Sequence, residues 1–246
     1  MTTAIETRGL TKRYGTRTAV DGLSLCVKTG EIFGLLGANG AGKTTTIRML
    51  CGLTPVSGGD ALVCGDSIVT APGKVKAKIN LSPQETAVAS RLTVEENLAL
   101  IARLYGSTAA EAREKAKRQM RELGLEARAG DRAKALSGGL QRRLSIAMAL
   151  ITEPEVLFLD EPTLGLDVRA RRELWREIEG LRGRMTVVLT SHYLEEIEHL
   201  ADRVAILNAG KLRTVGTVAQ ICAETGKSSL EEAFLELTDG EGDEEA

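Results

Sequence analysis

Aromatic residues and net charge are both scarce in this chain of 246 residues: aromatics make up 3%, and the formal net charge is −2. Proteins that hold single-stranded nucleic acid stack its bases on aromatic side chains, so this scarcity argues against such a platform. A charge close to zero argues against an extended nucleic-acid surface, although it leaves room for a local basic patch. We therefore expect no nucleic-acid partner.

Long apolar runs are missing as well. The sequence has no run of about eighteen apolar residues, the minimum for a helix that crosses a bilayer. Its first residues, MTTAIETRGL, lack the apolar segment of a signal peptide. With 27% charged and 43% hydrophobic residues, the composition is ordinary for a globular protein. We expect a soluble, cytoplasmic protein without a membrane span of its own.

Cysteines are few, and none of them shows the spacing of metal ligands. We expect small, buried thiols, which would suit a reducing compartment. The four cysteines are Cys26, Cys51, Cys64 and Cys222.

Strand patterns dominate the first third of the chain and return after residue 150. Residues 23–28 alternate between apolar and polar side chains, as in a half-buried strand, and the apolar segment EIFGLLG follows. Later strand patterns cover EVLFLDE, MTVVLTS and the expected hairpin RVAILNAGKLRTVG. Because a helical pattern over residues 168–181 separates the first two of these, we expect a parallel sheet covered on both faces.

The middle of the chain is helical. Thr93 and Glu96 have the spacing of a capping box, and Gly106 would end that helix. A second helix, AAEAREKAKRQMREL, has a weakly apolar face and is expected at the surface. The end of the chain, TDGEGDEEA, is acidic and is predicted to be disordered. The expected divisions are a core (1–84 and 151–216), an inserted helical subdomain (85–150) and a C-terminal extension (217–246).

The segment GANGAGKT carries the first chemical motif. It fits G-x-x-x-x-G-K-[ST] between a strand and a helix, the context that separates a phosphate loop from a chance glycine-rich turn. Its glycines would let backbone N–H groups reach phosphates. Lys43 would neutralise the β- and γ-phosphates, and the Thr44 hydroxyl would bind Mg²⁺. The predicted nucleotide contacts here are Gly37, Ala38, Asn39, Gly40, Ala41, Gly42, Lys43, Thr44 and Thr45.

Two carboxylates end the apolar strand VLFLDE. Asp160 sits where a direct or indirect partner of Mg²⁺ is needed, and Glu161 could polarise an attacking water. The alternative is an acidic turn after a strand. A candidate base directly beside the magnesium partner favours a hydrolase over a kinase.

The segment LSGGLQRRLSIAMAL resembles a second phosphate cradle, but it contains no lysine. Ser137, Gly138 and Gly139 would leave backbone N–H groups free at the positive end of a helix. An exposed helix end stabilises an anion by only about 0.3–1 kcal/mol, and by up to roughly 2 kcal/mol when partly buried. The segment therefore makes sense as half of a site whose other half contributes Lys43 and magnesium.

The order of phosphate loop, LSGGLQ, VLFLDEP and TSH resembles the ATPase subunit of an ATP-binding cassette (ABC) transporter over nearly the whole chain. The resemblance implies an α/β fold: a P-loop NTPase core with a mixed sheet, an antiparallel β subdomain and an inserted α-helical subdomain. It implies ATP and Mg²⁺ as cofactors, and a homodimer or heterodimer of ATPase subunits packed head to tail. It also implies a separate transmembrane permease, with this chain peripheral on the cytoplasmic face of the membrane.

The resemblance also assigns roles to residues with little meaning alone. Tyr14 is similar to the aromatic residue that stacks on adenine, although it could be an ordinary turn tyrosine. Gln84 matches the glutamine that approaches Mg²⁺ and water and reports to the permease. His192 matches the histidine that contacts the γ-phosphate, or it caps a helix start. Asp167 resembles an aspartate of the dimer interface and could equally be the N-cap of the next helix.

These implied roles complete the predicted site, in which the signature residues Ser137–Gly139 act on the partner subunit's ATP. The predicted catalytic residues are Glu161, His192, Gln84 and Lys43, and the predicted metal ligands are Thr44, Gln84 and Asp160.

The family resemblance leaves several functions open. Leu140 precedes Gln141 after the second signature glycine, and this order resembles an exporter-type subgroup, as do DEPTLGLD and SSLEEAFLELT. Members of that subgroup export drugs, lipids, polysaccharides or peptides. An importer ATPase shares every catalytic residue. Soluble ABC ATPases of repair or translation usually carry two cassettes or coiled-coil arms, whereas this chain has one cassette and no sustained heptads.

Overall fold

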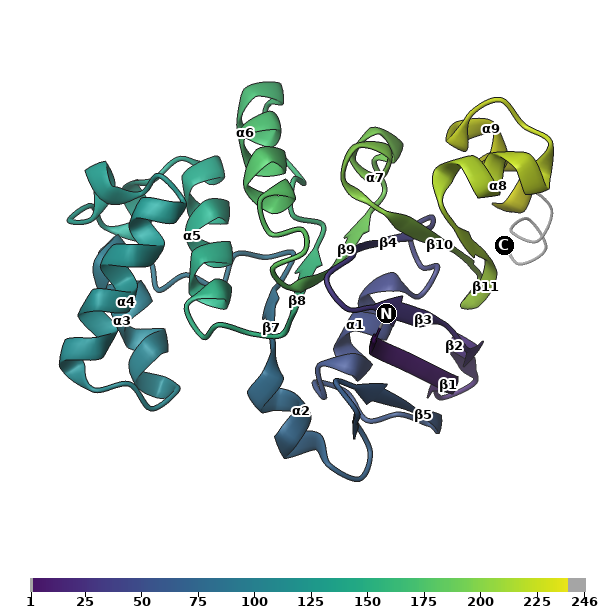
Figure 1. Cartoon of the computed structure of the whole chain (residues 1–246), viewed down its shortest axis with the longest axis horizontal. Helices are drawn as coiled ribbons and strands as arrows, with labels where there is room; N and C mark the ends of the chain where they lie inside the picture. The colour runs from purple at the N-terminus through teal and green to yellow at the C-terminus, as the bar shows by residue number, and fades with distance from the viewer. Residues whose placement is uncertain (1, 239–246) are drawn as a thin grey trace.

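The larger of two β-sheets forms the centre of the molecule in the computed structural model, which describes residues 2–238 (Figure 1). Within those residues its strand order is β11-β10-β4-β9-β8-β7, and only β11 runs antiparallel to its neighbour. The sheet is therefore mixed, as predicted. Its strands are β4 (Ile32–Leu36), β7 (Ile79–Ser82), β8 (Val156–Asp160), β9 (Thr186–Ser191), β10 (Arg203–Asn208) and β11 (Lys211–Gly216).

The smaller sheet is antiparallel and is built mainly from the first third of the chain. Its order is β2-β1-β5-β6, with β3 also paired to β1. At the tip of the β1–β2 hairpin, Tyr14 pairs with Arg17. The strands are β1 (Thr3–Tyr14), β2 (Arg17–Leu23), β3 (Cys26–Lys28), β5 (Gly58–Val63) and β6 (Asp66–Ser67).

Helices cover both ends of the sheets. Helices α3–α5 form one end of the molecule in Figure 1, and α8 and α9 lie towards the other. The predicted capping box at Thr93 and Glu96 is present, and Gly106 follows the C-cap of α3 directly. The helices are α1 (Lys43–Leu50), α2 (Pro72–Lys78), α3 (Val94–Leu104), α4 (Ala109–Glu122), α5 (Gly138–Leu150), α6 (Val168–Glu179), α7 (Leu194–Leu200), α8 (Val218–Thr225) and α9 (Leu230–Thr238), with short 3₁₀ turns at Glu126–Arg128 and Ala133–Ala135.

The hydrophobic core lies on both faces of the larger sheet. Along β4, Ile32 and Leu36 pack into a cluster with helices α3–α7, whereas Phe33 and Leu35 pack towards α1 and the antiparallel sheet. Every residue of β4, β8 and β9 is buried, because a parallel sheet covered on both sides has no solvent face. This double packing makes the central strands a rigid base for the loops that follow them.

The expectation of buried thiols is wrong for Cys26, which is exposed, and right for Cys51; Cys64 and Cys222 are partly buried. Cys26 lies on β3, where the alternation that buries Leu25 and Val27 turns it outward.

Within residues 2–238, no helix is both long and apolar enough to cross a bilayer. The same residues contain no cluster of three His, Cys, Asp or Glu side chains that could hold a metal ion. The predicted disorder of the acidic end falls largely on residues 239–246, outside the described residues.

Candidate nucleotide-binding site

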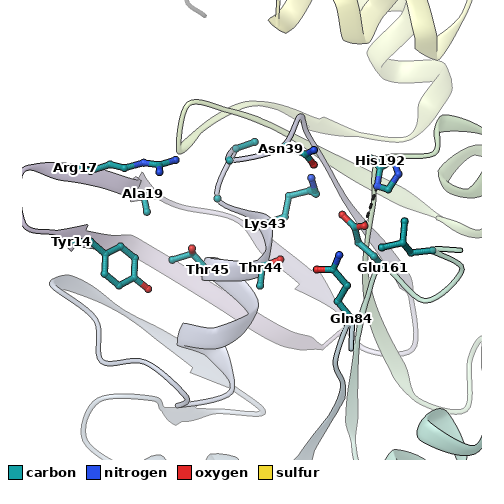
Figure 2. A pocket seen from close by; sticks show the side chains of 14 residues that line it. Tyr14, Arg17, Ala19, Asn39, Lys43, Thr44, Thr45, Gln84, Glu161 and His192 are labelled. Carbon is teal, nitrogen blue, oxygen red and sulfur yellow. Dashed lines mark ion pairs between the residues drawn. The ribbon is translucent and has the colours of Figure 1, made fainter. Parts of the chain in front are cut away.

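Three parallel strands end at the same edge of the larger sheet, and each leads directly into a predicted site segment. The phosphate loop follows β4, Glu161 follows β8 and His192 follows β9. Ligands of open α/β sheets bind outside these carboxyl ends. A cavity of about 660 Å³ opens there, with Tyr14 on one side and Gln84, Glu161 and His192 on the other (Figure 2). Its lining residues are Tyr14, Arg17, Ala19, Asn39, Gly40, Ala41, Gly42, Lys43, Thr44, Thr45, Gln84, Glu161, Leu164 and His192.

The phosphate loop leaves backbone donors free at the start of α1. Gly42 is the N-cap with φ of 103°, and no side chain caps the helix. A Cβ atom at Gly42 would lie 2.6 Å from the Ala19 carbonyl oxygen, and one at Gly37 would lie 2.5 Å from that of Leu207. Only glycine fits both positions, so the loop can wrap closely around an anion at the positive end of the helix.

Lys43 lies inside the loop and is only 5% exposed. Its Nζ donates hydrogen bonds to the carbonyl oxygens of Gly37 at 2.6 Å and Ala38 at 3.2 Å. Burial lowers the pKa of Lys43, while the charges of Glu161 and Asp160 act in the opposite direction. The ammonium group is thus held inside the phosphate loop, where a bound phosphate would meet its charge.

Asp160 and Thr44 meet below the loop. The Thr44 hydroxyl donates to Asp160 Oδ1 at 3.1 Å, and the Thr190 hydroxyl donates to the same oxygen at 2.6 Å. Asp160 is 5% exposed. A hydroxyl and a carboxylate oxygen at this distance are the kind of donor set that Mg²⁺ accepts beside substrate phosphates.

Glu161 is turned towards His192 by an unusual backbone conformation. Its φ is 49°, in the left-handed region that a residue with a side chain seldom adopts. The Glu161 N–H donates to the Thr190 hydroxyl oxygen at 2.9 Å, which holds this turn in place. Glu161 Oε2 then lies 3.0 Å from His192 Nδ1 (Figure 2). Backbone strain of this kind collects at functional sites, where it aims a side chain.

The opposite end of the cavity contains the predicted Tyr14 and, beside it, a residue that sequence reasoning missed. Tyr14 is 48% exposed, and Lys12 Nζ lies 4.8 Å from its ring centroid. Arg17, not predicted, pairs with Tyr14 across the hairpin, and its Nη2 would lie 3.3 Å from a Cβ at Gly40. The short spacing of the YGTR turn could have placed Arg17 beside Tyr14. Nothing local indicated Ala19 or Leu164, the other missed lining residues.

Gln84 joins the cavity from a third direction. It follows β7 and lines both the main cavity and a neighbouring one of about 380 Å³, which also contains Pro83 and Asp160. The structure thus places Gln84 on the same side as Thr44 and Glu161 (Figure 2).

The second predicted cradle does not line this cavity. Ser137 caps α5, and its hydroxyl oxygen accepts a hydrogen bond from the Leu140 N–H at 3.4 Å. Ser137 and Gly139 line a separate pocket of about 90 Å³, beside Arg143. Arg143 is a cation that sequence reasoning missed.

Asp167 is the N-cap of α6, one of its two predicted readings. Its Oδ1 accepts from the Ala170 N–H at 2.9 Å. A Cβ atom at Gly139 would lie 3.2 Å from that of Ala170, so the start of α6 lies against the signature glycines.

Known proteins are similar to this chain over the segments that contain both predicted cradles. A sequence model of a family described as "ABC transporter" matches residues 20–164. The linearmycin resistance ATP-binding protein of Bacillus subtilis is 41% identical over 240 residues, which cover 94% of this chain and 77% of that protein. The daunorubicin/doxorubicin resistance ATP-binding protein of Streptomyces peucetius is 42% identical over 246 residues, which cover 100% and 74%.

A further relative and a solved structure show the same similarity. The Nod factor export ATP-binding protein I of Paraburkholderia xenovorans is 41% identical over 230 residues, 93% of this chain and 76% of that protein. A structure described as the ATP binding subunit of an ABC transporter superposes with a TM-score of 0.85 at 30% identity, covering 95% of this chain and 99% of the other.

Proposed function

The chain belongs to the ABC transporter family as an ATPase domain that binds and hydrolyses ATP, and on that premise we propose that it powers an exporter. The observation that carries the direction of transport is the set of relatives: two are named for antibiotic resistance and one for Nod factor export. ATP-binding subunits of this family work with membrane components and as dimers. We propose that the partner is a permease in a separate chain. This permease would determine which molecule is exported.

The proposed ATP site is the cavity at the carboxyl ends of β4, β8 and β9. Tyr14 would stack on the base, and the free N–H groups at the start of α1, with Lys43, would bind the phosphates. The oxygens of Thr44, Asp160 and Gln84 would hold Mg²⁺. When bound, the metal neutralises charge on the β- and γ-phosphate oxygens.

Glu161 would accept a proton during hydrolysis, and His192 would orient the Glu161 carboxylate. The Glu161 carboxylate would accept the proton of the attacking water as general base. His192, 3.0 Å from that carboxylate, would keep it aimed at the cavity and contact the γ-phosphate. Both side chains face the end of Lys43 (Figure 2), as the attack on a loop-bound phosphate requires.

Two subunits would complete the site. Ser137 and Gly139 line their own pocket, apart from the phosphate loop, so a signature that acts on ATP needs a second copy or a paralogue. We propose a head-to-tail dimer in which each signature and Asp167 face the partner subunit. Dimer closure on ATP and opening on ADP would supply the work, because the two nucleotides differ in affinity for the closed state.

We also propose a division of the chain into subdomains and a location in the cell. Residues 85–150 would act as a helical subdomain that passes closure to the permease, with 1–84 and 151–216 as the catalytic core. The chain would lie in the cytoplasm, peripheral on the membrane.

Purification from membranes tests this function. Tagged chain extracted in mild detergent should co-purify with a polytopic membrane protein, and reconstitution of the two should stimulate ATP hydrolysis. The Lys43→Ala variant controls for ATP-dependent assembly. Recovery with ribosomes or DNA ends in place of a membrane protein would contradict the proposal, and net uptake by right-side-out vesicles would identify an importer.

A further inference from the structure

Arg142 is a buried arginine whose hydrogen bonds go to the loop that carries Gln84. It lies on α5, and only 5% of it is exposed. Its Nη1 donates to the Pro83 carbonyl oxygen at 2.6 Å, and its Nη2 donates to the carbonyl oxygen of Gln84 itself. Both acceptors are main-chain atoms, so the guanidinium holds the position of the loop without using the Gln84 side chain.

Two further polar contacts continue this link along the helix. Ser82 and Ser145 share a hydrogen bond of 3.0 Å between their buried hydroxyls. Asn80 Nδ2 donates to the Thr152 hydroxyl at 3.0 Å, just past the end of α5. Positions 142 and 145 lie on neighbouring turns of α5, Thr152 follows the end of that helix, and positions 80 and 82 share one strand face. We call these three contacts the α5–β7 seam.

The charge of Arg142 also faces the candidate site. Burial lowers the pKa of Arg142, while the negative charges of Asp160, Glu161 and Glu196 act to raise it. Arginine keeps its proton in proteins, so a buried cation stays within electrostatic range of the two site carboxylates. A buried charge is tolerated only where hydrogen bonds and opposite charges offset its lost hydration. The site supplies the opposite charges, and the loop supplies the carbonyls.

We propose that Arg142 is a positioning residue that fixes the Gln84 loop to the signature helix. Ser137 caps the same helix, about 7.5 Å from Arg142 along the helix axis at a rise of 1.5 Å per residue. Residues 83–88 form no regular secondary structure that would otherwise set their position. A shift of α5 when its N-terminus meets an anion is therefore passed to the Gln84 main chain through the guanidinium. The inference rests on the proposed role of Gln84 at the metal.

The Arg142→Gln variant tests the link, because glutamine keeps a donor but loses the reach, the fork and the charge. We expect kcat to fall roughly 10- to 100-fold, as for other residues that orient a metal ligand, with little change in ATP affinity. Amide exchange of residues 84–88 should become faster in the chain without nucleotide. Arg142→Lys should recover part of both losses, since lysine can donate to one carbonyl with its charge intact.

The matched control breaks the far end of the same seam. Thr152→Val removes the acceptor of Asn80 and should lower Tm, but kcat and the exchange of residues 84–88 should stay as in the wild type. If Thr152→Val slowed turnover as much as Arg142→Gln at equal loss of stability, Arg142 would be merely structural and the inference would be wrong.

A double-mutant cycle with Gln84→Ala separates this inference from the proposed function. If Arg142 acts through Gln84, the double variant should be little slower than the slower single variant. Additive losses in kcat, with a slow Gln84→Ala enzyme, would overturn the inference and leave the site assignment standing. Wild-type turnover of Gln84→Ala would contradict the assignment of Gln84 and, with it, the inference.

Discussion

The phosphate loop and the Ser137–Gly139 helix start offer an anion similar backbone groups in two different surroundings. At α1 no side chain caps the helix, and the buried ammonium of Lys43 is held by carbonyl oxygens of the same loop. At α5 the Ser137 hydroxyl caps the helix, and Ser137 is exposed. Arg143, which lines the same pocket as Ser137, forms ion pairs with Glu173 at 3.2 Å and with Glu177 at 3.1 Å.

These differences distinguish a strong anion-binding site at α1 from a weak one at α5. Charge-assisted hydrogen bonds in a buried loop are about twice as strong as neutral ones. An exposed helix end with a neutralised cation contributes about 0.3–1 kcal/mol and is screened by salt. The α5 end is therefore too weak to recruit ATP alone, which agrees with the proposed head-to-tail dimer, in which another subunit would already hold the phosphate.

Ser137→Arg should have the largest effect. A bulky cation at the α5 cap removes the acceptor for Leu140 and fills the place of the phosphate, so we expect turnover and ATP-dependent dimers to disappear. ATP binding by the monomer, measured by titration calorimetry, should stay near the wild-type value. Thr108→Arg is the matched control: it breaks the capping box of α4, away from both cradles, and should leave turnover intact. Collapse of monomer binding in Ser137→Arg would show that the signature acts on its own chain's nucleotide.

Glu161→Gln should slow hydrolysis by roughly 10²–10⁴-fold, the usual contribution of a general base. The amide keeps the shape of the side chain, so ATP binding should persist and ATP-bound dimers should accumulate in size-exclusion chromatography. Glu155→Gln changes an exposed carboxylate before the opposite end of β8 and should behave as the wild type. Normal turnover in Glu161→Gln would remove this residue as the base.

Lys43→Met should weaken ATP binding by about 10- to 150-fold, which corresponds to the roughly 1.5–3 kcal/mol of a hydrogen bond to a charged group. The same exchange at Lys134, an exposed lysine beside the signature, should leave the affinity unchanged. Equal losses at the two lysines would break the contrast between a charged cradle and an uncharged one. Fluorescent-nucleotide titration of the monomers distinguishes these results.

Glu177→Gln should have the smallest effect, on stability alone. Burial raises the pKa of the Glu177 carboxyl from 4.5 to about 7, because Arg143 only partly offsets it and Glu173 adds a like charge. Its Oε2 is buried without a hydrogen-bond partner among the described residues. The folded chain then binds a proton more tightly than the unfolded chain, so stability falls as pH rises from about 4.5 to about 7.

Thermal unfolding between pH 5 and pH 8 measures this slope. We expect Glu177→Gln to reduce the stability lost between pH 5 and pH 8 by about 1–3 kcal/mol, or roughly 2–10 °C in Tm. Glu173→Gln, a more exposed partner of the same arginine, is the control and should change the slope less. A steeper slope in Glu177→Gln would show that the ion pair with Arg143 outweighs burial.

Features with local causes were predictable from the sequence. The capping box at Thr93 follows from two residues three positions apart in one turn, and the outward face of Cys26 follows from the alternation around it, although the thiol was expected to be buried. The phosphate-loop motif is equally local as a pattern, because its glycines and lysine fall in one loop and the start of the helix after it. The patterns of these features need no knowledge of the rest of the fold, although the carbonyls of Leu207 and Ala19 that crowd Gly37 and Gly42 come from distant segments.

The remainder depends on partners that are far apart in the chain. Arg142 meets Pro83 and Gln84 only because β7 lies beside β8 at the edge of the sheet, under α5. Arg143 would be a free cation beside the signature if α6 did not bring Glu173 and Glu177 to it. The sequence by itself determined which groups can bind a phosphate. Only the tertiary structure decided that the two cradles lie apart and which charges reach each of them, because strand order and helix packing set the distances between remote residues.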